Sequence, residues 1–282
     1  MKNIFLSLLI LNLFNNIFSA GFTEVISNLR ILESYIKEYK EEKNSEESLT
    51  HLVTCYIREG RYKDITWTIA AGTCPKDLAT YISQKDTEKG TNASACRTYA
   101  DTDLPTNERT DFVHLFAVIN GIEFSNSYTE GTSGLVGWAG DLTELISDIK
   151  KCEGEVDELY NEAKKYFMNK SGFDLGDYVA DLDAPVFLSK KNDDTTFTEI
   201  IENFYSTHEF KNREKEFVRL TFPTVTDRTD KDEFREIIFD RYYNDSFIKL
   251  LEIKYSVSSG YDNHRKAAIY VFADYLYDKI KN

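Results

Sequence analysis

Two ionisable side chains lie in a segment that is otherwise almost entirely apolar. Asp111 and His114 are the only ionisable residues between positions 110 and 121, and the rest of 112–119 is apolar. Residues three apart lie on the same side of an α-helix, and a carboxylate beside an imidazole orients the ring and raises its pKa. The pair therefore supplies half of an acid–base site or half of a metal site.

A third acidic residue, Asp141, follows a segment rich in glycine. Glycines recur at every third position between 131 and 140, and such a density allows the backbone to approach a ligand or another element closely. With Asp111 and His114, Asp141 would complete a set able to bind a divalent metal ion or to divide the acid and base roles. The residues expected beside a substrate are Gly137, Trp138 and Gly140.

The same residues also have a purely structural interpretation. Asp111 fits the first turn of a helix, where the helix dipole favours a carboxylate, and His114 would then be a core histidine with satisfied hydrogen bonds. Asp141 precedes apolar residues at helical spacing, which is typical of an N-cap. Trp138 either stacks on a sugar ring or fills the core. Under this alternative the polar residues only brace the fold.

Four aspartates gather in a later helical segment. Asp174, Asp177 and Asp181 fall on the side opposite the apolar residues of that segment, and Asp183 follows them. This pattern is typical of a solvent-exposed helix face, and Pro185 is expected to end the helix. The pattern favours a solvated surface over catalytic carboxylates or a calcium site.

The elements that position all these residues are expected to be helices. Apolar residues recur at intervals of three and four through most of the chain, whereas alternating stretches are short. With 282 residues, 41% of them hydrophobic, and only 4 Pro, the chain can bury a sizeable core. We therefore expect a mainly α, multi-helix globular fold. The predicted helices cover residues 22–43, 47–58, 76–83, 111–120, 142–151, 155–168, 174–183, 196–207, 232–243, 245–255 and 263–280.

The composition changes near residue 152. Residues 21–152 contain all four cysteines, both Trp and most of the glycines, whereas residues 153–282 are charged, rich in Tyr and Phe, and free of cysteine. These regions are either two domains or parts of a single helical domain.

The first twenty residues, 1–20, predict a signal peptide. Lys2 precedes an apolar run over residues 4–13, and the small residues at 19–21 suit cleavage, most readily after Ser19 or Gly21. An uncleaved membrane anchor is disfavoured because the run is shorter than the ~20 residues that span a bilayer. No second apolar run of spanning length follows. We therefore expect a secreted, extracellular protein without a membrane span after cleavage.

Disulfide bonds and glycans would fit that location. The cysteines are even in number and lack the C-x-x-C spacing of a zinc site, so two disulfides are expected. Three pairings are open, and the sequential one joins Cys55 to Cys74 and Cys96 to Cys152. N-glycosylation sequons begin at Asn92, Asn169 and Asn244.

Charge and site together narrow the function. The chain has 34 Lys and Arg against 48 Asp and Glu, so its net charge is −14. Because a nucleic-acid partner needs a basic patch, we expect no nucleic-acid binding. The candidate site of Asp111, His114 and Asp141 favours a hydrolase of an extracellular polymer, which is a glycan or a peptide. Asp111 would orient His114, His114 would be the acid–base group or a metal ligand, and Asp141 would be the second carboxylate. A divalent metal ion is an optional cofactor. The alternative is a non-catalytic secreted binding or surface-associated structural protein.

Overall fold

A computed structural model describes residues 20–61, 74–99, 102–105, 108–128, 136–168, 174–191, 196–206, 213–257 and 259–281. Within these ranges the chain forms twelve α-helices, one 3-10 helix and three very short strands, so the mainly α expectation is confirmed. The expected signal peptide, the sequon at Asn169 and the first half of the glycine-rich segment lie outside the described residues. The helices are α2 (Phe22–Lys43), α3 (Leu49–Arg61), α5 (Leu78–Lys89), η1 (Ala93–Arg97), α6 (Phe112–Tyr128), α7 (Val136–Ile149), α8 (Val156–Tyr166), α9 (Leu175–Lys190), α10 (Phe197–Ser206), α11 (Arg213–Thr221), α12 (Lys231–Asn244), α13 (Ser246–Lys254) and α14 (Asp262–Lys281).

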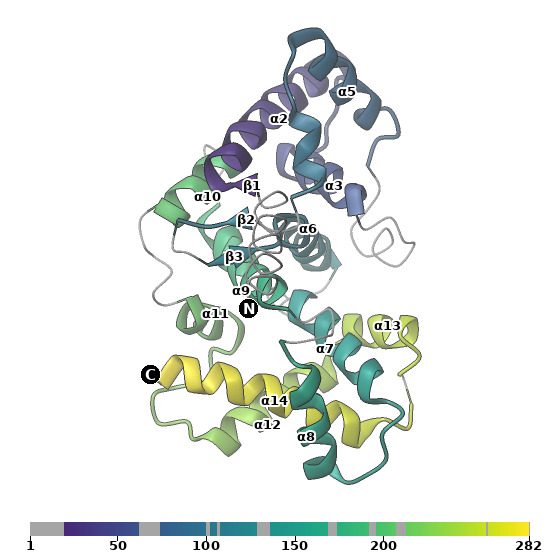
Figure 1. The fold of residues 1–282 in the computed structure, drawn as a ribbon, viewed down its shortest axis with the longest axis vertical. Helices are drawn as coiled ribbons and strands as arrows, with labels where there is room; N and C mark the ends of the chain where they lie inside the picture. Colours follow the sequence, from purple (N-terminus) through teal and green to yellow (C-terminus); the bar gives the residue numbers. More distant parts are fainter. Residues whose placement is uncertain are drawn as a thin grey trace, which may run out of the picture.

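The helices form an elongated molecule with two ends and a middle. In Figure 1, α2, α3 and α5 gather at one end, α8, α12 and α14 gather at the other, and α6 and α9 lie between them. The buried apolar side chains form one continuous cluster from Val25 in α2 to Leu276 in α14, on both sides of residue 152. No helix among the described residues is both long and apolar enough to cross a lipid bilayer.

A small sheet determines where α6 begins. β1 (Ala20–Gly21) pairs in parallel with β2 (Thr102–Asp103), which pairs antiparallel with β3 (Arg109–Thr110). β3 ends directly before Asp111, and α6 starts at the following residue. The sheet therefore holds the chain at the point where it enters the central helix. α6 itself packs against α3, α7 and α9, which explains why it is apolar nearly all round.

The helix α9 differs from its expected form in two ways. It continues through Pro185 to Lys190, and Asp177, Asp181 and Asp183 are all buried, so the expected helix end and solvent-exposed face are wrong. Proline has no N–H for the carbonyl four residues earlier, which is that of Asp181. The helix tolerates this loss because it packs against α6, α7, α10 and α11, and tertiary packing supplies most of a helix's stability. The acidic side of α9 faces these helices.

Trp138 belongs to the core. Its side chain is 0% exposed, and its ring stacks on Phe272 of α14 with 5.1 Å between the ring centroids. Of the two roles expected for this residue, core filling is the one observed, and the expectation that it stacks on a substrate is corrected. The contact joins α7 firmly to α14, so α7 is a rigid support for the residues that it carries.

One of the two expected disulfides is present. Cys55 of α3 is bonded to Cys74, with 5.7 Å between the Cα atoms. Cys96 and Cys152 are separate thiols, which corrects the expected second bond. Cys96 lies in η1, which packs on α2, α3 and α5, whereas Cys152 follows α7 and its carbonyl contacts His264 of α14. These elements lie at opposite ends of the molecule, and a disulfide requires Cα atoms within about 7 Å.

We expect a thiol count to separate these cysteines. Of the four cysteines, Cys152 should react in the native protein, Cys96 should join it after unfolding, and Cys55 and Cys74 should react only after reduction. The reason is that Cys96 is buried, and burial raises the pKa of its thiol well above the ordinary value. The measurement is titration with a coloured thiol reagent under the three conditions. A denatured, unreduced protein without any reactive thiol would contradict it and restore the second disulfide.

Candidate active site

Asp111 caps α6. Its Oδ1 accepts a hydrogen bond from the backbone N–H of His114 at 2.8 Å, which is the geometry of an N-cap carboxylate with the third residue of a helix. The hydrogen bond between these two residues therefore involves the main chain of His114. This corrects the expectation that Asp111 orients the imidazole.

The imidazole of His114 is surrounded by three other carboxylates. Its Nε2–H donates to Asp181 Oδ1 at 2.8 Å, and the same nitrogen lies 4.0 Å from Asp141 Oδ2. On the other side of the ring, Nδ1 lies 3.5 Å from Asp177 Oδ1. Asp177 and Asp181 are four residues apart on one face of α9, and Asp141 comes from α7. We call these four residues the His–Asp cluster.

Asp141 lies within α7, five residues after its start, and so the N-cap expected of it is wrong. The helix begins earlier, at Val136, and includes both Gly137 and Gly140. Glycine weakens a helix, so two of them near its start need a reason. Gly137 has one: a Cβ there would lie 2.1 Å from Asp181 Oδ1. Only a glycine lets the first turn of α7 approach this carboxylate so closely. The positive end of the α7 helix dipole then lies beside Asp181 and stabilises its negative charge.

The His–Asp cluster is almost completely enclosed. The exposed fractions are 1% for Asp181, 4% for His114, 5% for Asp141 and 7% for Asp177. Three carboxylate oxygens in it are buried and have no hydrogen-bond donor among the residues that the structure describes: Asp141 Oδ2, Asp177 Oδ1 and Asp181 Oδ2. Buried polar atoms are normally paired, so an orphaned set around one imidazole is unusual.

Burial and mutual charge shift the pKa of every member of the cluster. Burial by itself would lower the pKa of His114, but the charges of Asp141, Asp181 and Asp177 outweigh it and raise this pKa well above the ordinary value. Burial raises the pKa of Asp141 strongly, with a further contribution from the charge of Asp181. Burial raises the pKa of Asp177 to about 7 and also raises that of Asp181, in both cases against the opposing charge of His114. Such shifts are typical of functional sites.

A neighbouring aspartate shows what a fully paired buried carboxylate looks like in this fold. Asp183, also on α9, accepts hydrogen bonds from Arg213 Nε at 2.7 Å and Nη2 at 3.2 Å, and from the Tyr205 hydroxyl at 2.9 Å. Both of its oxygens are thus paired by groups from α10 and α11. Asp181 lies on the same helix and has an unpaired oxygen. Burial on α9 therefore does not by itself leave a carboxylate unpaired.

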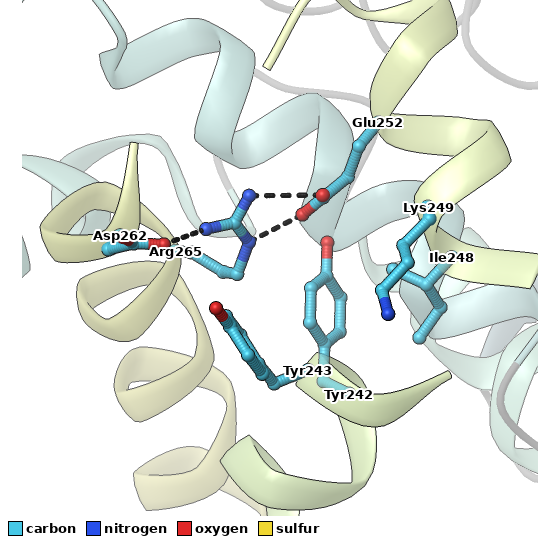
Figure 2. Close-up of a pocket in the computed structure, with 7 residues that line it drawn as sticks. All are labelled: Tyr242, Tyr243, Ile248, Lys249, Glu252, Asp262 and Arg265. Atoms are coloured by element: carbon cyan, nitrogen blue, oxygen red, sulfur yellow. Dashed lines mark hydrogen bonds and ion pairs between the residues drawn. The ribbon is translucent and has the colours of Figure 1, made fainter. Parts of the chain in front are cut away.

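A second group of charged residues lines a pocket between α12, α13 and α14 (Figure 2). Its volume is about 180 Å³. Arg265 donates two hydrogen bonds to Glu252 and one to Asp262, and Lys249 points into the same space. The two cations and two carboxylates of this pocket balance. The His–Asp cluster instead has three carboxyl groups around one imidazole and leaves buried oxygens unpaired, so the cluster is the stronger candidate.

Two of the three residues expected in the site meet, and two further members were missed. His114 and Asp141 converge, whereas Asp177 and Asp181 were assigned to a solvent-exposed face. A signal for them does exist in the sequence. Ala184 and Leu188 follow Asp177 and Asp181 by seven residues each and so lie on the same side of the helix. An acidic face that continues as an apolar face indicates burial.

The comparisons with known proteins place this site in a shared region. Residues 93–282 match the family model described as YkzU uncharacterised protein, and this range contains all of the His–Asp cluster. The uncharacterised protein YkzU of Bacillus subtilis (strain 168) is 30% identical over 115 residues, which cover 40% of this chain and 67% of that protein. No solved structure matches. Because the family model spans well over half of its length, the chain belongs to the YkzU family.

Proposed function

We propose that this protein is a secreted hydrolase of an extracellular polymer, a glycan or a peptide, with the His–Asp cluster as its active site. The observation that carries the proposal is the set of buried, unpaired carboxylate oxygens around His114. Such an arrangement opposes stability, since each unpaired buried group costs about 1–3 kcal/mol. Residues whose burial lowers the stability of the folded protein are typical of functional sites.

The side chains present match the chemistry of hydrolysis. A water molecule must give up a proton as its oxygen attacks the scissile bond, and the leaving group must gain one. Imidazole and carboxyl groups are the side chains that most often accept and donate these protons. Asp181 holds the ring of His114, while Asp141 and Asp177 lie on either side of it. Asp177 has the most exposed side chain of the four, at 10%.

Export is supported by the leader-like residues before position 20 and by the disulfide. Lys2, the apolar run over residues 4–13 and the small residues at 19–21 favour cleavage in this region. A cut after Ser19 would keep β1, which begins at Ala20, in the mature protein. The bond between Cys55 and Cys74 fits an oxidising compartment. In a host that glycosylates, Asn92 and Asn244, which are both exposed, would be acceptors.

The second candidate function is a non-catalytic secreted binding or surface-associated protein. One observation favours it, namely that no side chain of the His–Asp cluster is more than 10% exposed. In that case the cluster would brace α6, α7 and α9 from within. The two functions predict different effects on activity and on stability when a carboxylate of the cluster is replaced by an amide.

We expect Asp141→Asn to abolish hydrolysis without destabilising the protein. The amide keeps the size of the carboxyl group but cannot act as a base, and loss of one acid–base group typically costs ~10²–10⁴-fold in rate. Burial and the charge of Asp181 already disfavour the ionised form of Asp141, and the amide is neutral at every pH, so the free energy of unfolding should stay the same or rise by about 1 kcal/mol. The measurements are turnover of dye-labelled glycans and peptides, and a thermal melt.

Asp183→Asn is the matched control. It neutralises a buried carboxylate on α9 that is fully paired, so it should lower stability by about 1–3 kcal/mol and leave the activity of the folded fraction unchanged. If the unaltered protein cleaves none of the polymers and Asp141→Asn melts at a clearly lower temperature, the cluster is structural and the second candidate function replaces the first.

A further inference from the structure

We infer that His114, Asp141 and Asp181 bind a divalent cation of the zinc type. This inference rests on the proposed function, since it names the cofactor of the same site. One ligand atom from each of these residues lies within 4.8 Å of the other two. The three come from α6, α7 and α9, so the cation would be bound at the point where the central helices meet.

The distances suit one small ion. Zinc lies about 2.0–2.2 Å from nitrogen and oxygen ligands, so two ligands of the same tetrahedral ion are about 3.3–3.6 Å apart. His114 Nε2 and Asp141 Oδ2 are separated by 4.0 Å, so an ion would draw them slightly together. His114 Nε2 and Asp181 Oδ1 are closer, at 2.8 Å, because they share a proton that the ion would displace. A change of about half an ångström in each of these two separations would bring both to the distance that a tetrahedral ion requires.

The other ring nitrogen has the partner that a metal-bound histidine needs. Histidine ligands usually donate their second N–H to a carboxylate, which fixes the tautomer and the ring orientation. Asp177 Oδ1 lies 3.5 Å from His114 Nδ1 and accepts no hydrogen bond from any described residue. Nε2 would thus face the ion while Nδ1–H faces Asp177. Asp177 is a positioning residue in this arrangement.

The unpaired oxygens provide an observation independent of the ligand spacing. Asp141 Oδ2 and Asp181 Oδ2 belong to side chains that are more than nine-tenths buried, and neither accepts a hydrogen bond. Among the described residues, His114 is the only cationic group within ion-pair distance of Asp141 or Asp181. A divalent ion would occupy the unpaired oxygens and stabilise both carboxyl groups in their ionised form.

The donor set also selects the kind of ion. Imidazole and carboxylate are both ligand types that zinc and related first-row metals accept, and a set of three leaves further positions for water. Calcium requires six to eight oxygen ligands, which the three residues do not supply. A bound ion of this type lowers the pKa of a coordinated water, which is the chemistry that a hydrolase needs.

The test is metal binding by the purified protein after treatment with a chelator. Titration with Zn²⁺ in a calorimeter should show one equivalent bound and a higher melting temperature, and Co²⁺ should give a visible absorption spectrum with a nitrogen and oxygen ligand set. Asp141→Asn should weaken Zn²⁺ binding at least 100-fold, and Asp177→Asn by about 10–100-fold with the stoichiometry unchanged. Asp262→Asn, an exposed carboxylate in the pocket of Figure 2, is the matched control and should bind as the unaltered protein does.

The outcomes separate this inference from the proposed function. A chelated protein that binds no Zn²⁺ and no Co²⁺ in saturable form, or binding that survives Asp141→Asn, overturns the cation site. If such a protein still hydrolyses its substrate at the full rate, the hydrolase stands without a metal. If one equivalent binds and depends on Asp141 but no polymer is cleaved, the cation site stands and the hydrolase fails. Circular dichroism of each variant shows that loss of binding does not come from loss of fold.

Discussion

Gly137→Ala is expected to disrupt the candidate site and to lower stability by about 2 kcal/mol, the range for overpacking a dense core. The new Cβ would lie 2.1 Å from Asp181 Oδ1, 2.8 Å from Asp181 Cγ and 2.9 Å from Val118 Cγ1. Asp181 cannot swing away without breaking its bond to His114, and α7 cannot retreat because Trp138 is packed on Phe272. The better helix propensity of alanine returns only about 1 kcal/mol.

The measurements for Gly137→Ala are urea unfolding and hydrolysis by the folded fraction. Gly21→Ala is the matched control, because its φ of −68° suits any residue and a Cβ there would have nothing within 4 Å. The control should unfold like the unaltered protein. Equal midpoints for the two variants would show that α7 and α9 are not as closely packed as the structure has them.

Arg213→Met is expected to lower stability by about 3–5 kcal/mol, the range for removing one partner of a buried ion pair. Arg213 and Asp183 have side chains that are 3% and 0% exposed. The variant would leave Asp183 with only the Tyr205 hydroxyl as a partner for a buried charge. Methionine fills a similar apolar volume, so the loss reports the charge and not a cavity.

The pH dependence of Arg213→Met checks this cause. Burial raises the pKa of Asp183, and Arg213 opposes that rise. Without Arg213 the pKa in the folded protein moves further above its unfolded value of about 4, so folding is favoured when the carboxyl is protonated. The defect should be largest at neutral pH and shrink as the pH falls towards 5. Urea unfolding at both pH values measures the defect.

The double variant Arg213→Met with Asp183→Asn should recover part of the loss of stability at neutral pH. A loss below about 0.5 kcal/mol in Arg213→Met alone would contradict the account.

Much of the fold could be predicted from apolar spacing alone. Residues 22–43 were expected to form one helix and do so as α2, and the last helix, expected over 263–280, is α14 (Asp262–Lys281). In both, the spacing of apolar residues follows the helical period and no competing signal interferes. The helix predicted over residues 111–120 is also present, as the start of α6, and it is buried, as its apolar residues indicate.

The rest depended on tertiary contacts that a single segment does not reveal. Charge on one side of α9 suggested solvent, but His114 and the first turn of α7 stabilise those acids in the interior. Asp141 had the local surroundings of an N-cap, yet α7 extends back to Val136 because its glycines allow close packing against Asp181. In each case a long-range partner overrides a local preference, and such partners are found where the polar site lies.

The hydrogen bond between His114 and Asp181 has a consequence for the order in which the chain folds. It joins residues 67 positions apart, and no single helix or hairpin contains both. Closing so long a loop is slow compared with forming the individual helices, so the two side chains meet only after α6, α7 and α9 have docked. A chain caught before that step has its helices but no His–Asp cluster. The imidazole of His114 is thus a natural spectroscopic reporter of the docking of these helices, and the cluster forms only when the polypeptide is complete through α9.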